Sequence, residues 1–351
     1  MTGRSRRFVV LCLQGFGDAL EATPLVAQLR RNVPNAEITV VAMRPQVREL
    51  YEALPALADR VIYVPYWERG ALGATRALVG LPFVTRSEAS FLAYPAARPE
   101  YALFAQAISS GAHYTHDYRP KATKVLDRRK THRVPIALKH NVLRNLDLLS
   151  AAGFVVEIPD GYVVPDHWKS PRVHNRRVLM HIGSIAHHGL EAKRWPAESF
   201  LELGRVLQTE SIEVVLLSGP AEREETARVA RELSNATIFA GDLPSVARTL
   251  ASVGAVVAND NGIAHLAAAV GTPVLALMGP TPPEFGPYGK GAVAFRPSAC
   301  PPCFGVATTD ARCALDIDYA CLKRDIRVAD VVESVLQLLR GAHSQDVPQE
   351  A

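Results

Sequence analysis

The sequence predicts an α/β protein of two Rossmann-like domains, each built on a parallel sheet. Short apolar, β-branched runs alternate with amphipathic stretches from residue 8 and again from residue 177, as in parallel sheets covered by helices on both faces. Between the two series, residues 157–169 contain Pro159, Gly161 and Pro165, a composition typical of a linker. A chain of 351 residues can bury two separate cores. We therefore expect a first domain over 1–165, a second over 170–330, and a C-terminal helix and tail over 331–351.

The first series begins with a strand over 8–13, which the glycine-rich turn 14–18 follows. Such turns commonly bind nucleotides, but two glycines do not make the three-glycine fingerprint of dinucleotide sites. An NAD-linked oxidoreductase is therefore not expected. The other elements predicted in this series are a helix from Thr23 to Arg31, strands over 37–43, 60–65 and 91–94, and helices over 45–54, 101–109 and 139–152.

The second series opens with a strand over 178–182 and a polar loop over 183–193. Pro196 then starts a helix with apolar side chains on one face. The later elements are a strand over 212–218, helices over 221–233 and 244–250, and a closing amphipathic helix over 328–340.

Residues 256–281 form the most informative stretch of this series. A buried strand ends at Asn259-Asp260-Asn261-Gly262, whose side chains and permissive glycine suit the start of a helix. Gly271 is placed to end that helix, and 274–278 forms the next strand. A βαβ unit puts the helix N-terminus at the carboxyl edge of the sheet, where its amides and dipole favour a phosphate or carboxylate. The alternative is that these side chains only cap a helix and that His265 is a core histidine.

The overall composition is that of an ordinary globular protein. With 48% hydrophobic and 21% charged residues, the chain is neither disordered nor fibrous. No uninterrupted apolar run reaches the roughly 18 residues that a membrane-spanning helix needs. The run over 8–13 becomes polar too soon for a secretory signal, so a cytoplasmic protein is expected.

The net charge of +4 is modest, but cations are concentrated over residues 119–144. Asp127 is the single acid against Arg119, Lys121, Lys124, Arg128, Arg129, Lys130, Arg133, Lys139 and Arg144. Such a run is typically a solvated loop, and the functional alternative is a patch that attracts an anionic acceptor or the inner membrane surface. Nucleic acid is not expected as a partner, because the sequence contains no recognition helix, zinc-finger array or aromatic stacking motif.

Three motifs resemble those of the ADP-heptose:lipopolysaccharide heptosyltransferase family (glycosyltransferase family 9). The stretch N-D-N-G-I-A-H-L-A-A-A-V-G-T-P from Asn259 resembles its donor-site signature, G-D-A-L-E-A-T-P from Gly17 its N-terminal signature, and K-R-W-P from Lys193 its K-x-W-P element. The motifs stand in family order, and the resemblance covers residues 8–335. It implies the GT-B architecture, two Rossmann-like domains facing a cleft. It also implies an inverting transferase that moves a heptose from ADP-heptose to a hydroxyl of a lipopolysaccharide core or other glycan.

In this family resemblance, Asp18 is the catalytic base. A carboxylate within hydrogen-bond reach can take the proton of the acceptor hydroxyl as the anomeric carbon becomes oxocarbenium-like. The alternative is that Asp18 caps the following helix. Two neighbouring positions depart from the family: Cys12 replaces a common basic residue, and Gln14 replaces a common serine.

The resemblance also implies the donor site. Lys193, helped by Ser184 and the amides near Gly262, would stabilise the leaving diphosphate, and no catalytic cofactor is needed. The full donor-binding set expected is Gly17, Ser184, Lys193, Asp260, Asn261, Gly262 and His265. The alternative for K-R-W-P is a surface Lys-Arg pair with Trp195 packed on the core.

Four cysteines lie close together near the C-terminus. Cys300, Cys303, Cys313 and Cys321 have a spacing that suits a closed tetrahedral site, so a structural zinc or iron ion is expected. Unligated or redox-labile thiols are the alternative, and no catalytic role is expected.

Two other functions stay open at this stage. One is a glycosyltransferase that uses another nucleotide sugar on a natural-product or protein acceptor. The other is a non-catalytic protein that binds a sugar nucleotide, against which the presence of Asp18, Lys193 and Asp260 together argues.

Overall fold

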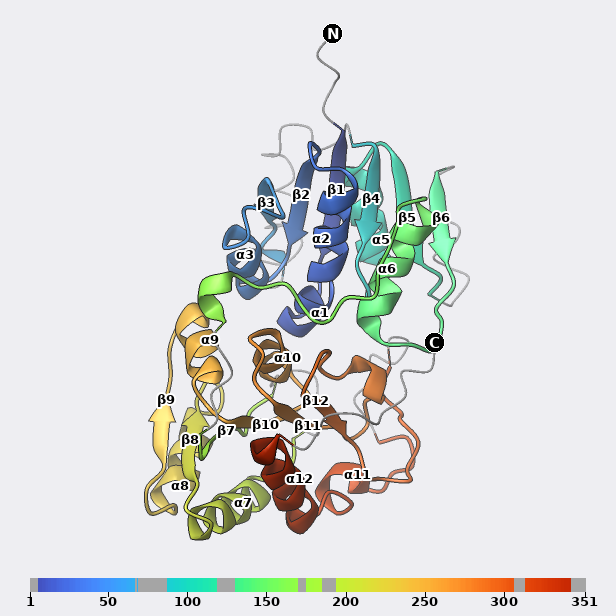
Figure 1. Cartoon of the computed structure of the whole chain (residues 1–351). Helices are drawn as coiled ribbons and strands as arrows, with labels where there is room; N and C mark the ends of the chain where they lie inside the picture. Colours follow the sequence, from blue (N-terminus) through green and yellow to red (C-terminus); the bar gives the residue numbers. More distant parts are fainter. Residues whose placement is uncertain are drawn as a thin grey trace. The chain divides into compact units, whose positions relative to one another are not determined.

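The computed structural model describes residues 6–66, 68, 87–118, 130–169, 175–184, 194–305 and 313–341. The chain divides into two compact units, Met1–Pro165 and Asp166–Ala351. Each contains a six-stranded sheet in which every strand pair is parallel (Figure 1). The predicted α/β class with two parallel sheets is therefore confirmed. Within the described residues, no helix has the length and apolar character needed to cross a membrane.

The sheet of the first unit has the strand order β3-β2-β1-β4-β5-β6. Its strands are β1 (Arg7–Cys12), β2 (Glu37–Ala42), β3 (Arg60–Tyr63), β4 (Ala89–Leu92), β5 (Ala112–His116) and β6 (Thr131–Val134). Its helices are α1 (Phe16–Glu21), α2 (Thr23–Asn32), α3 (Pro45–Glu52), α5 (Pro99–Ile108) and α6 (Asn141–Ala151). In Figure 1, α2 and α6 cover one face of this sheet. The central strand β1 is buried from its second residue onward, as its apolar run predicts.

The sheet of the second unit has the order β12-β11-β10-β7-β8-β9. Its strands are β7 (Arg177–His181), β8 (Glu213–Leu217), β9 (Thr237–Phe239), β10 (Ala255–Asn259), β11 (Val274–Leu277) and β12 (Ala292–Phe295). Its helices are α7 (Ala197–Thr209), α8 (Arg223–Arg231), α9 (Leu243–Ala251), α10 (Gly262–Ala269), α11 (Ala320–Lys323) and α12 (Val328–Arg340), and 3₁₀ turns lie at η2 (Asp166–Trp168) and η4 (Pro283–Phe285). The helix α12 buries Val331, Val335 and Leu338 in the core of this unit.

Several elements of the structure are not predicted by the sequence pattern. The strands β5 and β6 carry polar residues such as His113, Thr115 and His132, so neither shows an apolar run, and β9 and β12 are short, incompletely buried edge strands. The turn predicted over 14–18 continues into α1, because Gly15 serves as the N-cap of a short helix.

The interpretation of residues 119–144 as a solvated loop is wrong over 131–134 and 141–144, whereas residues 135–140 do form a loop. Residues 131–134 form β6, and Arg144 is buried in α6 with an exposed fraction of 3%. Residues 119–129 lie outside the described residues.

The two sheets have the same topology, and this topology indicates where a ligand would bind to each sheet. In each unit the chain adds three strands in one direction, then returns to the other side of the first strand and adds three more. Open parallel sheets bind ligands at the carboxyl ends of the two strands where the order reverses. These strands are β1 and β4 in the first unit, and β7 and β10 in the second.

Candidate functional site

Asp18 follows β1 at the switch point of the first sheet. It is the third residue of α1, and its Oδ2 accepts a hydrogen bond from the N–H of Gly15 at 2.8 Å. The carboxylate therefore does cap α1, as the structural alternative in the sequence predicts. Because this cap fixes the orientation of the side chain, it is compatible with a second role for the carboxylate in chemistry.

Arg44 is a neighbour of Asp18 that the motif comparison misses. It is the N-cap residue of α3, directly after β2, the strand beside β1. Burial lowers the pKa of Arg44, while the negative charge of Asp18 is one of the interactions that oppose this shift. The charge of Arg44 therefore interacts with that of the candidate base from the neighbouring strand of the sheet. Its position just after a buried strand is the sequence signal that could have identified it.

Cys12, which stands where relatives often have a cation, is a buried thiol. Its Sγ lies 3.5 Å from the hydroxyl of Tyr51, and burial raises the pKa of Cys12 to about 12. It carries no charge at neutral pH, so the cation near Asp18 comes from Arg44.

A buried polar network holds the helices around this edge. Asn141 Nδ2 donates to Glu21 Oε2 at 3.1 Å, and Arg144 Nη1 donates to Asn141 Oδ1 at 2.6 Å. Asn145 donates to the carbonyl of Glu21 and accepts from the N–H of Tyr94. The network joins α1, α6 and the end of β4, so it fixes the surroundings of Asp18.

The switch point of the second sheet is built by two asparagines. Asn259 ends β10, and its Nδ2 donates to the carbonyl of Ile182 at 2.9 Å, while its Oδ1 accepts from the N–H of Trp195 at 2.8 Å. Asn261 is the N-cap of α10, and its Oδ1 accepts from the N–H groups of Ile263 and Ala264 at 2.9 and 3.3 Å. These bonds tie α10 to the end of β7.

Glu222 is the main residue of this edge that sequence reasoning misses. It precedes α8, has an exposed fraction of 7%, and its Oε1 accepts from His181 Nε2 at 3.0 Å and from the N–H of Gly219 at 2.8 Å. Burial favours a higher pKa for Glu222, but the hydrogen bonds from His181 and Gly219 and the positive charge of Arg194 outweigh it and lower the pKa. The site therefore holds an ionised, nearly buried carboxylate. The preceding Gly219-Pro220 turn, directly after a buried strand, is the signal that could have identified it.

The structure also shows where other residues of the predicted donor site lie. Ser184 lies just after β7, and its carbonyl accepts from Arg194 Nη2 at 2.8 Å. Trp195 is buried against Phe200, with ring centroids 4.9 Å apart, as the core alternative for that residue predicts. His265 is also buried, with an exposed fraction of 5%.

Asp260 is half-buried between the two asparagines, and Gly262 is the first residue of α10. Lys193 lies outside the described residues. Gly17 belongs to α1 of the first unit and not to the second sheet, so the structure does not bring it together with the others within one unit.

Of the four clustered cysteines, Cys321 lies in α11 and Cys303 lies beside the segment after β11. Cys321 is buried, and burial together with the charges of the other three cysteines raises its pKa to about 11. The N–H of Cys303 donates to the carbonyl of Pro280 at 2.9 Å. Within the described residues, no group of three or more His, Cys, Asp or Glu side chains is arranged to hold a metal ion. The zinc or iron hypothesis therefore rests on the spacing of the four cysteines and stays a prediction.

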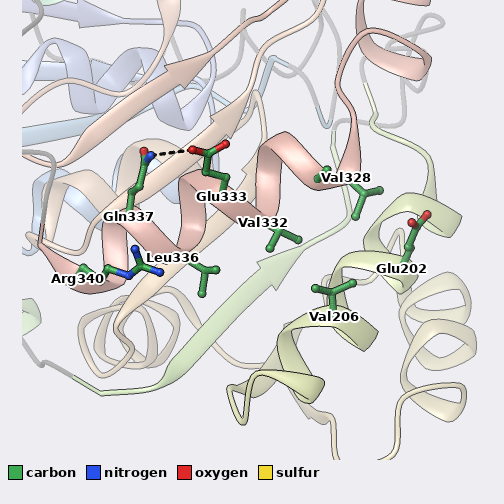
Figure 2. Close-up of a pocket in the computed structure, with 9 residues that line it drawn as sticks. Glu202, Val206, Val328, Val332, Glu333, Leu336, Gln337 and Arg340 are labelled. Carbon is green, nitrogen blue, oxygen red and sulfur yellow. Dashed lines mark hydrogen bonds between the residues drawn. The ribbon is translucent and has the colours of Figure 1, made fainter.

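A groove of about 430 Å³ lies away from these edges, between α7 and α12 (Figure 2). Its wall is apolar along Val206, Val332 and Leu336, with Glu202 and Glu333 near its rim. It contains none of the predicted site residues, so it is not part of the candidate site.

Two solved structures share the fold of the whole chain. A glycosyltransferase family 9 protein from Veillonella parvula is 19% identical with a TM-score of 0.76, and the match covers 97% of this chain and 99% of that one. The E. coli heptosyltransferase WaaC, solved with ADP-2-deoxy-2-fluoro heptose, is 20% identical with a TM-score of 0.72, covering 94% and 99%. The protein therefore has the GT-B fold class.

The sequence comparison then gives the family. The pattern of glycosyltransferase family 9 (heptosyltransferase) matches residues 100–312, more than half of the chain, so the protein belongs to this family. Lipopolysaccharide heptosyltransferase 1 of Pseudomonas aeruginosa is 40% identical over 115 residues, which cover 32% of each chain. The chain thus spans about a third of the length of the curated relatives it matches.

Proposed function

We propose that the protein is a glycosyltransferase that moves a heptose from ADP-heptose to a hydroxyl of a saccharide acceptor. The observation that carries the proposal is the polar site at the switch point of the second sheet, formed by the stretch that resembles the family's donor signature. The choice of sugar is supported by a relative named as a lipopolysaccharide heptosyltransferase and by a structural neighbour described with an ADP-heptose analogue.

In this proposal the donor diphosphate binds at the N-terminus of α10. Within the described residues, the N–H of Gly262 makes no hydrogen bond, whereas those of Ile263 and Ala264 are taken by Asn261. A free N–H on the axis of a helix dipole favours an anion. Lys193, the sequence neighbour of Arg194 at this edge, supplies the cation that stabilises the leaving diphosphate.

Glu222 binds hydroxyl groups of the same donor. Its Oε1 carries both hydrogen bonds from the protein, and within the described residues Oε2 carries none. An ionised carboxylate is an acceptor only, so it selects ligand groups that donate, such as the hydroxyls of a sugar.

Asp18 acts on the acceptor. The acceptor oxygen forms a bond to the anomeric carbon while the bond to the diphosphate breaks, and the hydroxyl proton passes to the carboxylate of Asp18. Attack from the side opposite the leaving group in a single step inverts the configuration. Arg44 stabilises the negative charge of Asp18 before the transfer.

Contact with the inner membrane surface is also part of the proposal. Leu138, in the loop before α6, has an exposed fraction of 89%, and Lys130 is exposed at the start of β6. An exposed apolar side chain in a segment rich in cations suits the surface of an anionic bilayer.

Calorimetric titration with ADP, UDP, GDP and their sugars, followed by a donor-hydrolysis assay, tests the function. We expect binding of ADP and of ADP-heptose, and slow hydrolysis of the latter. Preference for UDP or GDP would instead indicate another nucleotide sugar, and tight binding without turnover even with saccharide acceptors would indicate a non-catalytic binding protein. No binding of any nucleotide would refute the proposal.

A further inference from the structure

Three side chains from three elements form a continuous hydrogen-bonded chain at the edge of the second sheet. Asn261 caps α10, His181 ends β7, and Glu222 precedes α8. Asn261 Nδ2 lies 3.0 Å from His181 Nδ1, and His181 Nε2 lies 3.0 Å from Glu222 Oε1. His181 and Glu222 are nearly buried, with exposed fractions of 8% and 7%. The chain connects the N-terminus of α10 to a carboxylate two strands away in the sheet.

The direction of every hydrogen bond in this chain follows from the helix. Because Asn261 Oδ1 accepts from the N–H groups at the start of α10, its Nδ2 must be the atom that faces His181. Nδ2 donates to His181 Nδ1, so the imidazole proton lies on Nε2 and is donated to Glu222. His181 therefore accepts at one nitrogen and donates at the other.

The space around Glu222 is built closely on this arrangement. A Cβ at Gly183 would lie 2.5 Å from the Glu222 side chain, and a Cβ at Gly219 would lie 2.6 Å from it. Glycines after β7 and β8 therefore leave just enough space for the Glu222 side chain, and the side chain that holds its carboxylate is His181.

We propose that His181 is a positioning residue for the donor: it holds the Glu222 carboxylate and the N-terminus of α10 at a fixed separation, so that hydroxyl groups and phosphate of one ligand bind together. This inference rests on the proposed function, because it assigns a role within the same donor site. Preorganised polar groups bind a ligand more tightly because they lose less freedom on binding.

The role is separable from folding. The parallel pairing of β7 with β10 does not involve the imidazole, and Asn261 caps α10 through Oδ1 without it. Loss of the imidazole should therefore loosen Glu222 and Asn261 relative to each other, while leaving the sheet and helix in place.

The test is a double-mutant cycle measured as ADP affinity by calorimetry. His181→Ala should weaken ADP binding about tenfold or more in the unaltered background, but less than about threefold when Glu222 is already replaced in Glu222→Gln. His181→Gln should recover most of the affinity, because its amide can donate to Glu222 and accept from Asn261. His167→Ala, at an exposed histidine of the same unit, is the matched control and should bind ADP normally.

The outcomes are distinguishable. ADP binding that His181→Ala leaves unchanged, or an equal loss in the Glu222→Gln background, would overturn the role of His181 and leave the proposed function standing. A lower melting temperature with unchanged affinity would also overturn it. If His181→Ala does not fold, ADP affinity is compared between His181→Gln and the shorter His181→Asn. The proposed role of His181 requires that only the Gln variant retains the affinity, and equal affinities would overturn it. Failure of the unaltered protein to bind any nucleotide would refute the proposed function itself.

Discussion

The buried His116 should make the first unit sensitive to mild acid. It ends β5 with an exposed fraction of 0%, its Nε2 lies 3.0 Å from the carbonyl of Arg144, and its ring packs edge-on against Tyr94 at 5.2 Å. Burial lowers its pKa from 6.5 to about 4, against the opposing charge of Asp147. The folded unit therefore holds His116 without a proton under conditions in which the unfolded chain would take one.

The sign and size of the effect follow from this difference. Between pH 6.5 and 4 the unfolded state binds more protons, so the free energy of unfolding falls as pH falls. Relative to its value well above pH 6.5, the free energy of unfolding is lower by about 2 kcal/mol at pH 5 and by about 3 kcal/mol below pH 4 because of His116.

The assay is urea unfolding at pH 7.5 and pH 5.0 for the unaltered protein and for His116→Gln, whose amide can still donate to the carbonyl of Arg144. Other titrating groups are common to both proteins, so the unaltered protein should lose about 2 kcal/mol more than the variant. Equal pH dependence in the unaltered protein and His116→Gln, or an NMR titration of His116 near pH 6.5, would refute the reasoning.

Three further predictions concern the candidate sites. Asp18→Asn should keep the hydrogen bond from Gly15 and the melting temperature but lower kcat by about 10² to 10⁴, and an Asn variant with normal turnover would place the base elsewhere. Lys193→Ala should cost about 2 kcal/mol of transition-state stabilisation, measured as kcat/KM, and an unchanged value would remove Lys193 from the site. Protein purified without added metal should carry one zinc or iron ion per chain on its four clustered cysteines, and elemental analysis that finds less than about a tenth of an equivalent would indicate free thiols.

The sequence predicts most of the buried strands because their residues are apolar without interruption. The strands β1, β7 and β10 could be located to within a residue or two, since parallel strands covered on both faces need such runs. The N-cap Asn261 and the C′ glycine Gly271, which has a φ of +86°, were predictable because local backbone chemistry determines them. The edge strand β3 is predicted, but the short edge strands β9 and β12 and the polar strands β5 and β6 are not, because short length or polar residues remove the pattern of a buried strand.

Contacts between distant segments were not predictable in the same way. His181 and Glu222 are 41 residues apart, and nothing in the local pattern of either stretch indicates that they meet. The basic run predicts a surface position for Arg144, yet Arg144 is buried, and Asn141 and the carbonyl of Ala137 accept its hydrogen bonds. Such partners depend on strand order, which the sequence pattern alone leaves undetermined.

The two sheets have the same strand order, yet different side chains follow the strands at their switch points. In both, the first and fourth strands are neighbours, so the residues after them meet at one edge. After β1 the chain turns into a short helix with Asp18 in its first turn, which places a carboxylate at that edge. After β10 it turns into α10, whose free amides and asparagine cap suit an anion. The proposed base follows the first strand of one sheet and the proposed anion site follows the fourth strand of the other, so both lie at a switch point, and the side chains after each strand, not the fold, decide the chemistry.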